Sequence, residues 1–171
     1  MKTLIISSSL SPESRSYILC QNVYIGLKKK KVDVELLDLR KVELLPFHRR
    51  PTNEMKELIE KVKKADSIIF GMGVHNYSIN DSLKIVLDSL PNKACMDKFF
   101  GIVCAAAGER SYLSTMHLTQ MCMNEWRMIQ LPRIVYATWR DFEGDKLVSG
   151  EVIEQVEMFC DEFVDIGKKL A

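Results

Sequence analysis

A ten-residue stretch near the start of the chain decides the fold, and it reads Ser7-Ser8-Ser9-Leu10-Ser11-Pro12-Glu13-Ser14-Arg15-Ser16. It follows a short apolar run at residues 4–6, which predicts a buried strand, and it leads into a helical apolar pattern over residues 14–30. Helix N-termini leave backbone N–H groups unpaired and carry partial positive charge, and serine hydroxyls add donors without bulk. The stretch therefore predicts a phosphate site at the first strand–helix turn of an α/β sheet.

The residue types of this turn exclude two familiar nucleotide-binding loops. No Gly-Lys-Ser/Thr follows it, as a Walker loop requires, and it contains none of the glycines of a dinucleotide-binding turn. One structural alternative stays open at this point. Ser11 would then be only a helix N-cap, with Pro12 at the first helical position and no ligand.

The length and composition are typical of a globular protein. Its 171 residues are 47% hydrophobic and 27% charged, so we expect one domain over residues 1–171. The net charge of +1 gives no attraction for nucleic acid or membrane, and no apolar run approaches the ~18 residues of a membrane-spanning helix. The first apolar run is too short for a signal peptide. The 5 scattered cysteines form no C-x-x-C pair and no metal-ligand spacing with histidine, which predicts reduced thiols, a cytoplasmic protein and no metal site.

Predicted strands and helices alternate along the chain. The apolar patterns predict strands at residues 4–6, 32–39, 67–71, 99–106 and 133–137, and helices at residues 14–30, 53–64, 82–90, 112–128 and 151–170. Such alternation is typical of parallel strands joined by right-handed helical crossovers. The sequence therefore predicts an α/β fold, with a five-stranded parallel sheet and helices on both faces.

Polar residues and glycines follow three of the predicted strands. These segments are the serine turn, residues 71–81 and residues 106–112. Ligands of such sheets bind at the carboxyl ends of the strands. Glycines bring a backbone close to a flat heterocycle, and neighbouring polar groups hydrogen-bond its edge. A phosphate at the serine turn and a planar ring between the other two loops describe a mononucleotide.

The same loops carry a family resemblance. Ser9-Leu10 followed by Ser14-Arg15-Ser16 resembles the phosphate loop of the NADPH-dependent FMN reductase family. His75-Asn76-Tyr77-Ser78-Ile79, followed by Leu83-Lys84 and Asp88, is similar to that family's flavin loop, Pro-x-Tyr-Asn-x-Ser-Ile-Pro, and to the helix after it. The resemblance covers nearly the whole chain. It implies a flavodoxin-like three-layer sandwich with FMN and NADPH as cofactors.

The chain departs from the family pattern at several loop positions. Ser8 replaces a glycine, Ser11 a common arginine and His75 a tyrosine, while Asn80 and Asp81 replace a proline and a glycine. Tyr77 stands where the family usually has a small residue, and we expect it to supply part of the aromatic surface lost at position 75. These departures predict a lower flavin affinity and a lower reductase rate.

The resemblance and the turn chemistry together predict cofactor contacts in three loops. The expected contacts are Ser9, Leu10, Ser11, Ser14, Arg15 and Ser16 at the phosphate, and Val74, His75, Asn76, Tyr77, Ser78, Ala107, Gly108, Glu109 and Arg110 around the ring. Arg15 either pairs with the phosphate or points to solvent, and Arg110 either meets a nicotinamide phosphate or is solvated. We expect a structural or stacking role for His75 and no catalytic residue, because the flavin itself accepts hydride.

The predicted function is passage of hydride from NAD(P)H to FMN, a quinone or another small electron acceptor. The alternative is a non-enzymatic electron carrier or flavin-binding module. Flavodoxins that carry electrons are usually strongly acidic with a Thr-rich first loop, so this neutral, Ser-rich chain favours the enzyme.

Two apolar clusters suggest that the protein forms oligomers. Leu83, Val86, Leu87 and Leu90 predict an interface helix, and the methionines around Trp126 predict core or subunit interface. Family members are commonly dimers or tetramers, so we expect a homodimer or homotetramer.

Overall fold

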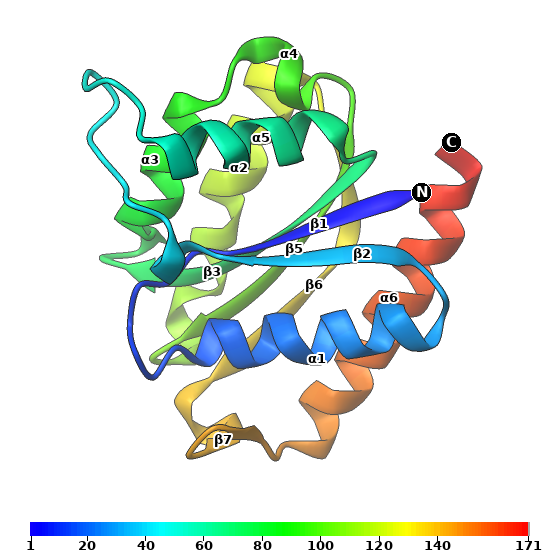
Figure 1. The fold of residues 1–171 in the computed structure, drawn as a ribbon. Coiled ribbons are helices and arrows are strands. Elements are labelled where there is room, and N and C mark those ends of the chain that lie inside the picture. Colours follow the sequence, from blue (N-terminus) through cyan, green and yellow to red (C-terminus); the bar gives the residue numbers. More distant parts are fainter. Residues whose placement is uncertain (171) are drawn as a thin grey trace.

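Five parallel strands form the centre of the molecule (Figure 1). The computed structural model describes residues 1–170, and the strands lie side by side in the order β2-β1-β3-β5-β6. Their bounds are β1 Lys2–Ser7, β2 Asp33–Asp38, β3 Ser67–His75, β5 Phe99–Ala106 and β6 Ile129–Thr138. The predicted α/β fold with a parallel sheet is confirmed.

Helices cover both faces of this sheet, which gives the predicted three layers (Figure 1). Alternating side chains of each strand separate the two cores, so Ile5 packs on one side and Leu4 and Ile6 on the other. One face is covered by α1 Arg15–Lys29 and α6 Gly150–Leu170, and the other by α2 Asn53–Lys64, α3 Asp81–Ser89, α4 Asn92–Cys95 and α5 Thr115–Trp126. None of the helices within residues 1–170 has the length and apolar character needed to span a membrane.

Short elements at the strand ends differ from the sequence prediction. The predicted helix 112–128 is a 3-10 turn, η2 Glu109–Ser114, followed by α5, and the last strand begins four residues earlier than predicted. The elements without a sequence prediction are β4 Ser78–Ile79, which pairs antiparallel with the end of β3, the hairpin of β7 Phe142–Glu143 with β8 Lys146–Leu147, and the turns η1 Leu39–Lys41 and η3 Trp139–Asp141. Segments of two or three residues have no hydrophobic period, so only their tertiary contacts define them.

The predicted interface helix is wrong in one respect. Leu83 and Val86 are fully buried, and Leu87 and Leu90 are only 2% and 6% exposed. All four belong to the core between the sheet and its helices. The apolar stripe of an amphipathic helix faces its own sheet first, so these side chains are not free to contact another subunit.

The α6 helix approaches β5 closely at Gly101. A Cβ atom at this position would lie 2.6 Å from Phe159 Cζ and 3.3 Å from Phe163 Cδ2. Both phenylalanines are fully buried, so neither has room to turn away.

We expect Gly101→Ala to lower the free energy of unfolding by about 1–3 kcal/mol, because the added methyl overpacks the core. Urea denaturation followed by circular dichroism measures this change. Gly150→Ala is the matched control, since a Cβ there meets no atom within 4 Å. Equal destabilisation by both substitutions would contradict the packing argument.

Candidate functional site

The register of the sheet brings the predicted loops to one edge. Ser7, the last residue of β1, pairs with Asp38 on one side and Gly71 on the other. Farther along the sheet, Ala106 pairs with Thr138. After β1 the chain moves first to β2 and then back across to β3, so the strand order reverses between β1 and β3. Ligands of open α/β sheets bind beside such a reversal.

The serine turn forms the wall of this site next to α1. Ser14 is the N-cap of α1, and its hydroxyl oxygen accepts the Tyr17 N–H at 3.1 Å. Ser14 and Ser16 are buried with their Oγ atoms 3.1 Å apart, and Ser9 Oγ accepts the Ser11 N–H at 3.3 Å. The alternative in which Ser11 caps the helix is therefore wrong. The structure places the predicted hydroxyls of Ser14 and Ser16 at the N-terminus of α1, and that of Ser9 earlier in the turn.

Arg40 anchors the outer side of this turn. Its guanidinium group donates to both carboxylate oxygens of Asp38 at 2.7–2.9 Å and to the Pro12 carbonyl oxygen at 3.2 Å. It also lies over the ring of Tyr17, with its Cζ atom 4.2 Å from the ring centroid. The hydrogen bonds to Asp38 raise the pKa of Arg40. Charge-assisted bonds thus join the turn to the end of β2.

Arg15 lies on the outer side as well. Its exposed side chain lines a hollow of about 610 Å³ together with Tyr17, Arg40 and Asp145. Leu10 and Ser11, at the tip of the turn, are exposed.

The second loop is a tight hairpin at the end of β3. His75 pairs with Ser78 across a two-residue turn, in which Asn76 and Tyr77 have φ angles of 49° and 59°. Two-residue hairpins favour positive φ at both turn positions, and asparagine accepts it readily. A bulky residue there is strained by about 1–2 kcal/mol. Tyr77 nevertheless occupies this position, with 64% of its surface exposed.

The hairpin and the third loop enclose a hollow of about 430 Å³. Tyr77 lies on one side of it, and residues 107–111 line another. The Tyr136 hydroxyl donates to the Gly108 carbonyl oxygen at 2.6 Å and so holds the third loop in place. Burial raises the pKa of Tyr136, which keeps this donor protonated. Ala107, Gly108, Glu109 and Arg110 therefore line the same hollow as Tyr77.

Two further residues of this hollow were not predicted from the sequence. Trp139 and Arg140 follow the end of β6 and line the hollow opposite the third loop. The Arg140 guanidinium carbon lies 5.6 Å from the Trp139 ring centroid. The rule of strand carboxyl ends applies equally to the predicted strand 133–137, and it would have found both residues.

The structure separates His75 from this hollow. His75, Asn76 and Ser78 line another hollow, of about 500 Å³, which also contains His117 and lies between the hairpin and the starts of α3 and α5. His75 Nδ1 lies 3.7 Å from Asp81 Oδ1, and His117 Nδ1 lies 3.1 Å from Ser78 Oγ. Val74 packs against the core. The predicted ring contacts therefore fall into two groups, one around Tyr77 and one around His75.

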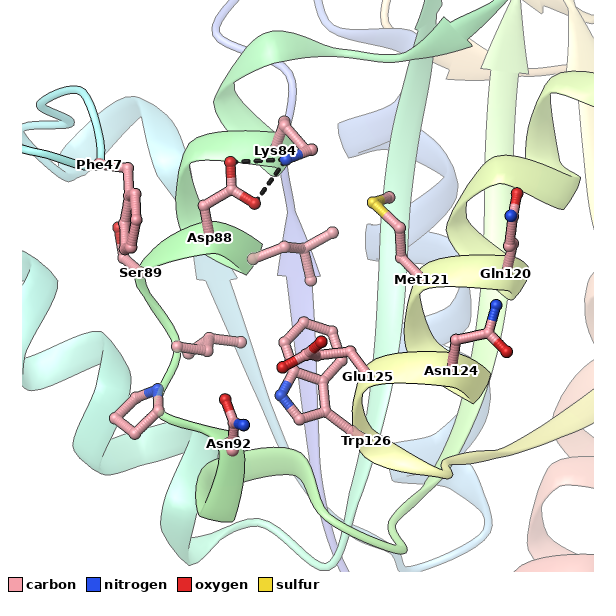
Figure 2. Close-up of a pocket in the computed structure, with 13 residues that line it drawn as sticks. Phe47, Lys84, Asp88, Ser89, Asn92, Gln120, Met121, Asn124, Glu125 and Trp126 are labelled. Carbon is pink, nitrogen blue, oxygen red and sulfur yellow. Dashed lines mark hydrogen bonds and ion pairs between the residues drawn. The ribbon is translucent and has the colours of Figure 1, made fainter.

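The largest of the hollows described lies elsewhere, between α3 and α5 (Figure 2). It has a volume of about 780 Å³ and contains none of the predicted site residues. Lys84 and Asp88 form an ion pair along its α3 side, and the buried Trp126 forms part of its floor. Within residues 1–170, the Trp126 indole nitrogen has no hydrogen-bond partner.

The residues at the carboxyl edge fit FMN. Hydroxyl groups and a helix N-terminus suit a phosphate dianion. The hollow beside Tyr77 offers aromatic surfaces and backbone groups to a planar ring, and it lies at the same edge of the sheet. Fold and site together define a flavodoxin-like α/β protein with a mononucleotide site.

Comparison with known proteins gives the family. The family model described as NADPH-dependent FMN reductase matches residues 1–141, and the chain belongs to this family. A relative in Geobacillus thermodenitrificans, named NAD(P)H-dependent FAD/FMN reductase, is 29% identical over 96% of this chain and 92% of its own. A probable NADPH:quinone oxidoreductase 1 of Oryza sativa subsp. japonica is 27% identical over 81% of this chain and 74% of its own.

Solved structures show the same fold. The apo form of the NADH:FMN oxidoreductase EMOB superposes with a TM-score of 0.80 and 18% identity, over 95% of this chain and 87% of that one. The flavoenzyme NAD(P)H:(acceptor) oxidoreductase FerB from Paracoccus denitrificans superposes with a TM-score of 0.78 and 17% identity, over 99% of this chain and 98% of that one. Membership of the family makes the chain an FMN-binding NAD(P)H oxidoreductase, and the solved structures show its flavodoxin-like fold.

The cysteines play no part in this site. All 5 are free and buried, and burial raises the pKa of Cys20, Cys95, Cys104 and Cys160 to about 12. A thiol with this pKa is ~10⁻⁴ thiolate at pH 8, and the thiolate is the reactive form.

We expect the folded protein to leave a disulfide reagent such as Ellman's reagent unreacted at pH 8, and all 5 thiols to react in guanidinium. Because the folded state holds these protons above the ordinary thiol pKa, its stability falls as the pH rises from about 9 towards 12. Absorbance of the released thiolate measures the reaction. Rapid labelling of a native thiol would contradict the burial described above.

Proposed function

We propose that the protein holds FMN across the three loops and passes hydride from NADPH through it to a quinone or another small acceptor. One observation carries this proposal: the serine turn at the N-terminus of α1 shares an edge of the sheet with the hollow between Tyr77 and residues 107–111. Membership of the NADPH-dependent FMN reductase family supports it. The chain itself would form one FMN-binding domain, and its free cysteines support a reducing, cytoplasmic location.

The phosphate would be held by the serine turn. The donors are the hydroxyls of Ser9, Ser14 and Ser16, together with backbone N–H groups from Leu10 and Ser11 to the start of α1. Each charge-assisted hydrogen bond contributes roughly 1.5–3 kcal/mol. Micromolar affinity corresponds to about −8 kcal/mol, so three such bonds and burial of the ring suffice.

The flavin ring would lie in the hollow beside Tyr77. A strained backbone persists where the surrounding structure and a function maintain it, and Tyr77 offers a ring face there. The backbone of Ala107 and Gly108 would meet the polar edge of the flavin, and Trp139 would close the far side. The hairpin residues Val74, His75, Asn76 and Ser78 would then support the ring from behind.

Bound FMN supplies the redox chemistry, since it accepts hydride and passes electrons on. The protein needs no general acid for this step, so the hollow has only to position the nicotinamide and exclude water. Arg110 and Arg140 are exposed and line the hollow, where they offer two cations to the additional phosphate of NADPH. Their charges favour NADPH over NADH.

A titration with FMN tests this proposal. We expect saturable quenching of flavin fluorescence with a Kd of about 1 µM or lower, followed by oxidation of NADPH when a quinone is added. Binding without NADPH oxidation would support the electron carrier instead. No binding at tens of micromolar FMN would overturn the proposal.

Substitution of Tyr77 sharpens this test. Tyr77→Gly relieves the positive φ and removes the ring, so we expect higher stability by about 1 kcal/mol and weaker FMN binding by about tenfold. Tyr77→Phe keeps the ring and should retain most of the affinity. An unchanged Kd in Tyr77→Gly would exclude the tyrosine as a flavin contact.

We further propose that two copies of the chain associate over α3 and α5. Met116 and Met123 are 49% and 51% exposed and lie on the face of α5 that carries Gln120, a residue that lines the large hollow (Figure 2). Phe47, 56% exposed, lines its other side. An apolar rim around a hollow with an unpartnered indole N–H is typical of a surface that a second subunit covers.

Light scattering after size-exclusion chromatography measures this association. We expect a dimer or tetramer at 50 µM protein, and a shift towards monomer in Met123→Glu, because the added charge opposes burial of this face. Lys146→Glu, a charge change on the exposed β8, is the control and should leave the mass unchanged. A wild-type monomer at this concentration would contradict the proposal.

A further inference from the structure

Two of the departures from the family pattern meet in the interior. Ser8, in place of a glycine, and Asn80, in place of a proline, are 72 residues apart in sequence and both fully buried. Ser8 Oγ lies 2.8 Å from Asn80 Oδ1 and 2.7 Å from the Gly71 carbonyl oxygen, so its hydroxyl proton has two acceptors. The two departures are thus direct partners.

The Asn80 amide is fully used in this network. Its Oδ1 accepts from Ser8 Oγ and from the Gly73 N–H at 3.2 Å. Its Nδ2 donates to the Ser8 carbonyl oxygen at 3.1 Å and to Ser82 Oγ at 2.7 Å. Ser82 Oγ then donates to the same Ser8 carbonyl at 2.6 Å. An amide group has two donors and two lone pairs on its oxygen, and here all four have a partner, with the Ser8 proton shared between Asn80 Oδ1 and the Gly71 carbonyl oxygen.

The Asn80 side chain bonds to the two loops and does not cap its own helix. Asn80 stands at the N-cap of α3, where an asparagine side chain normally accepts from the first turn of the helix, yet it makes no capping bond. Its amide instead joins the beginning of the serine turn to the end of β3. Because it is buried, each of these bonds is costly to break.

We infer that Ser8 and Asn80 together are positioning residues, which set the separation between the phosphate end and the ring end of the FMN site. Ser8 lies at the start of the serine turn, and the hairpin of β3 and β4 lies between Gly73 and Asn80. The hydrogen bonds of Asn80 therefore join the two loops at their bases. This inference rests on the proposed function. On this inference the two departures compensate each other, which differs from the sequence expectation of a lower flavin affinity.

The affinity for FMN tests this inference, with stability measured beside it. We expect Asn80→Ala to raise the Kd of FMN about tenfold, because the two loops lose their common anchor. Ser8→Ala keeps three of the four Asn80 bonds, so its Kd should rise only about threefold. In the double variant, adding Ser8→Ala to Asn80→Ala should change the Kd of FMN by less than about twofold, because the Asn80 side chain is then already absent.

A matched control separates positioning from general destabilisation. Thr3 and Ser67 form another buried side-chain hydrogen bond, 3.0 Å long, between β1 and β3 at the opposite edge of the sheet. Thr3→Val should lower the melting temperature yet leave the Kd of FMN within about twofold of wild type. Equal effects of Thr3→Val and Asn80→Ala on the Kd would overturn the inference.

The remaining outcomes are distinct. Wild-type binding with an unchanged Kd in both Ser8→Ala and Asn80→Ala would overturn the inference and leave the proposed function intact. Failure of the wild type to bind FMN would overturn both. If Asn80→Ala does not fold, the threefold change in Ser8→Ala decides, because that variant removes only one hydroxyl group.

Discussion

The parallel register between β1 and β3 is the constraint on which the rest of the structure depends. It places Ser7, the last residue of β1, beside Gly71, so the turn after β1 begins next to β3, which continues to His75 and its hairpin. Reversal of the strand order between these two strands keeps helices from covering the space above them. The helix N-terminus of α1, the serine hydroxyls and the hollow beside Tyr77 all lie at this carboxyl edge of the sheet.

Two polar side chains, Arg40 and Asn80, tie the serine turn to its neighbouring strands. Arg40 joins the outer side of the serine turn to β2 through Asp38, and Asn80 joins its inner side to β3. The turn is therefore held from two directions before any ligand binds. Buried hydrogen bonds that fix a loop in advance reduce the conformational freedom that its donors lose when a ligand binds.

The residue types at positions 75–77 decide which side chains the hairpin of β3 and β4 presents to each hollow. Asn76 accepts positive φ at little cost, whereas Tyr77 carries strain and projects its ring beside residues 107–111. His75 lies two residues earlier, at the end of β3, and lines the hollow at α3 and α5 together with Asn76. The aromatic side chain that lines the hollow with residues 107–111 is therefore at position 77 and not at position 75.

The sequence by itself determined the alternation of strands and helices, the serine turn and the three loops, because hydrophobic period and residue chemistry are local properties. Only the tertiary structure decided that Ser8 and Asn80 are partners, since their hydrogen bond spans 72 residues. It also buried Leu83 and Val86 in the core between the sheet and its helices. Contacts between distant segments depend on packing and register, and no local pattern encodes which side chain meets which.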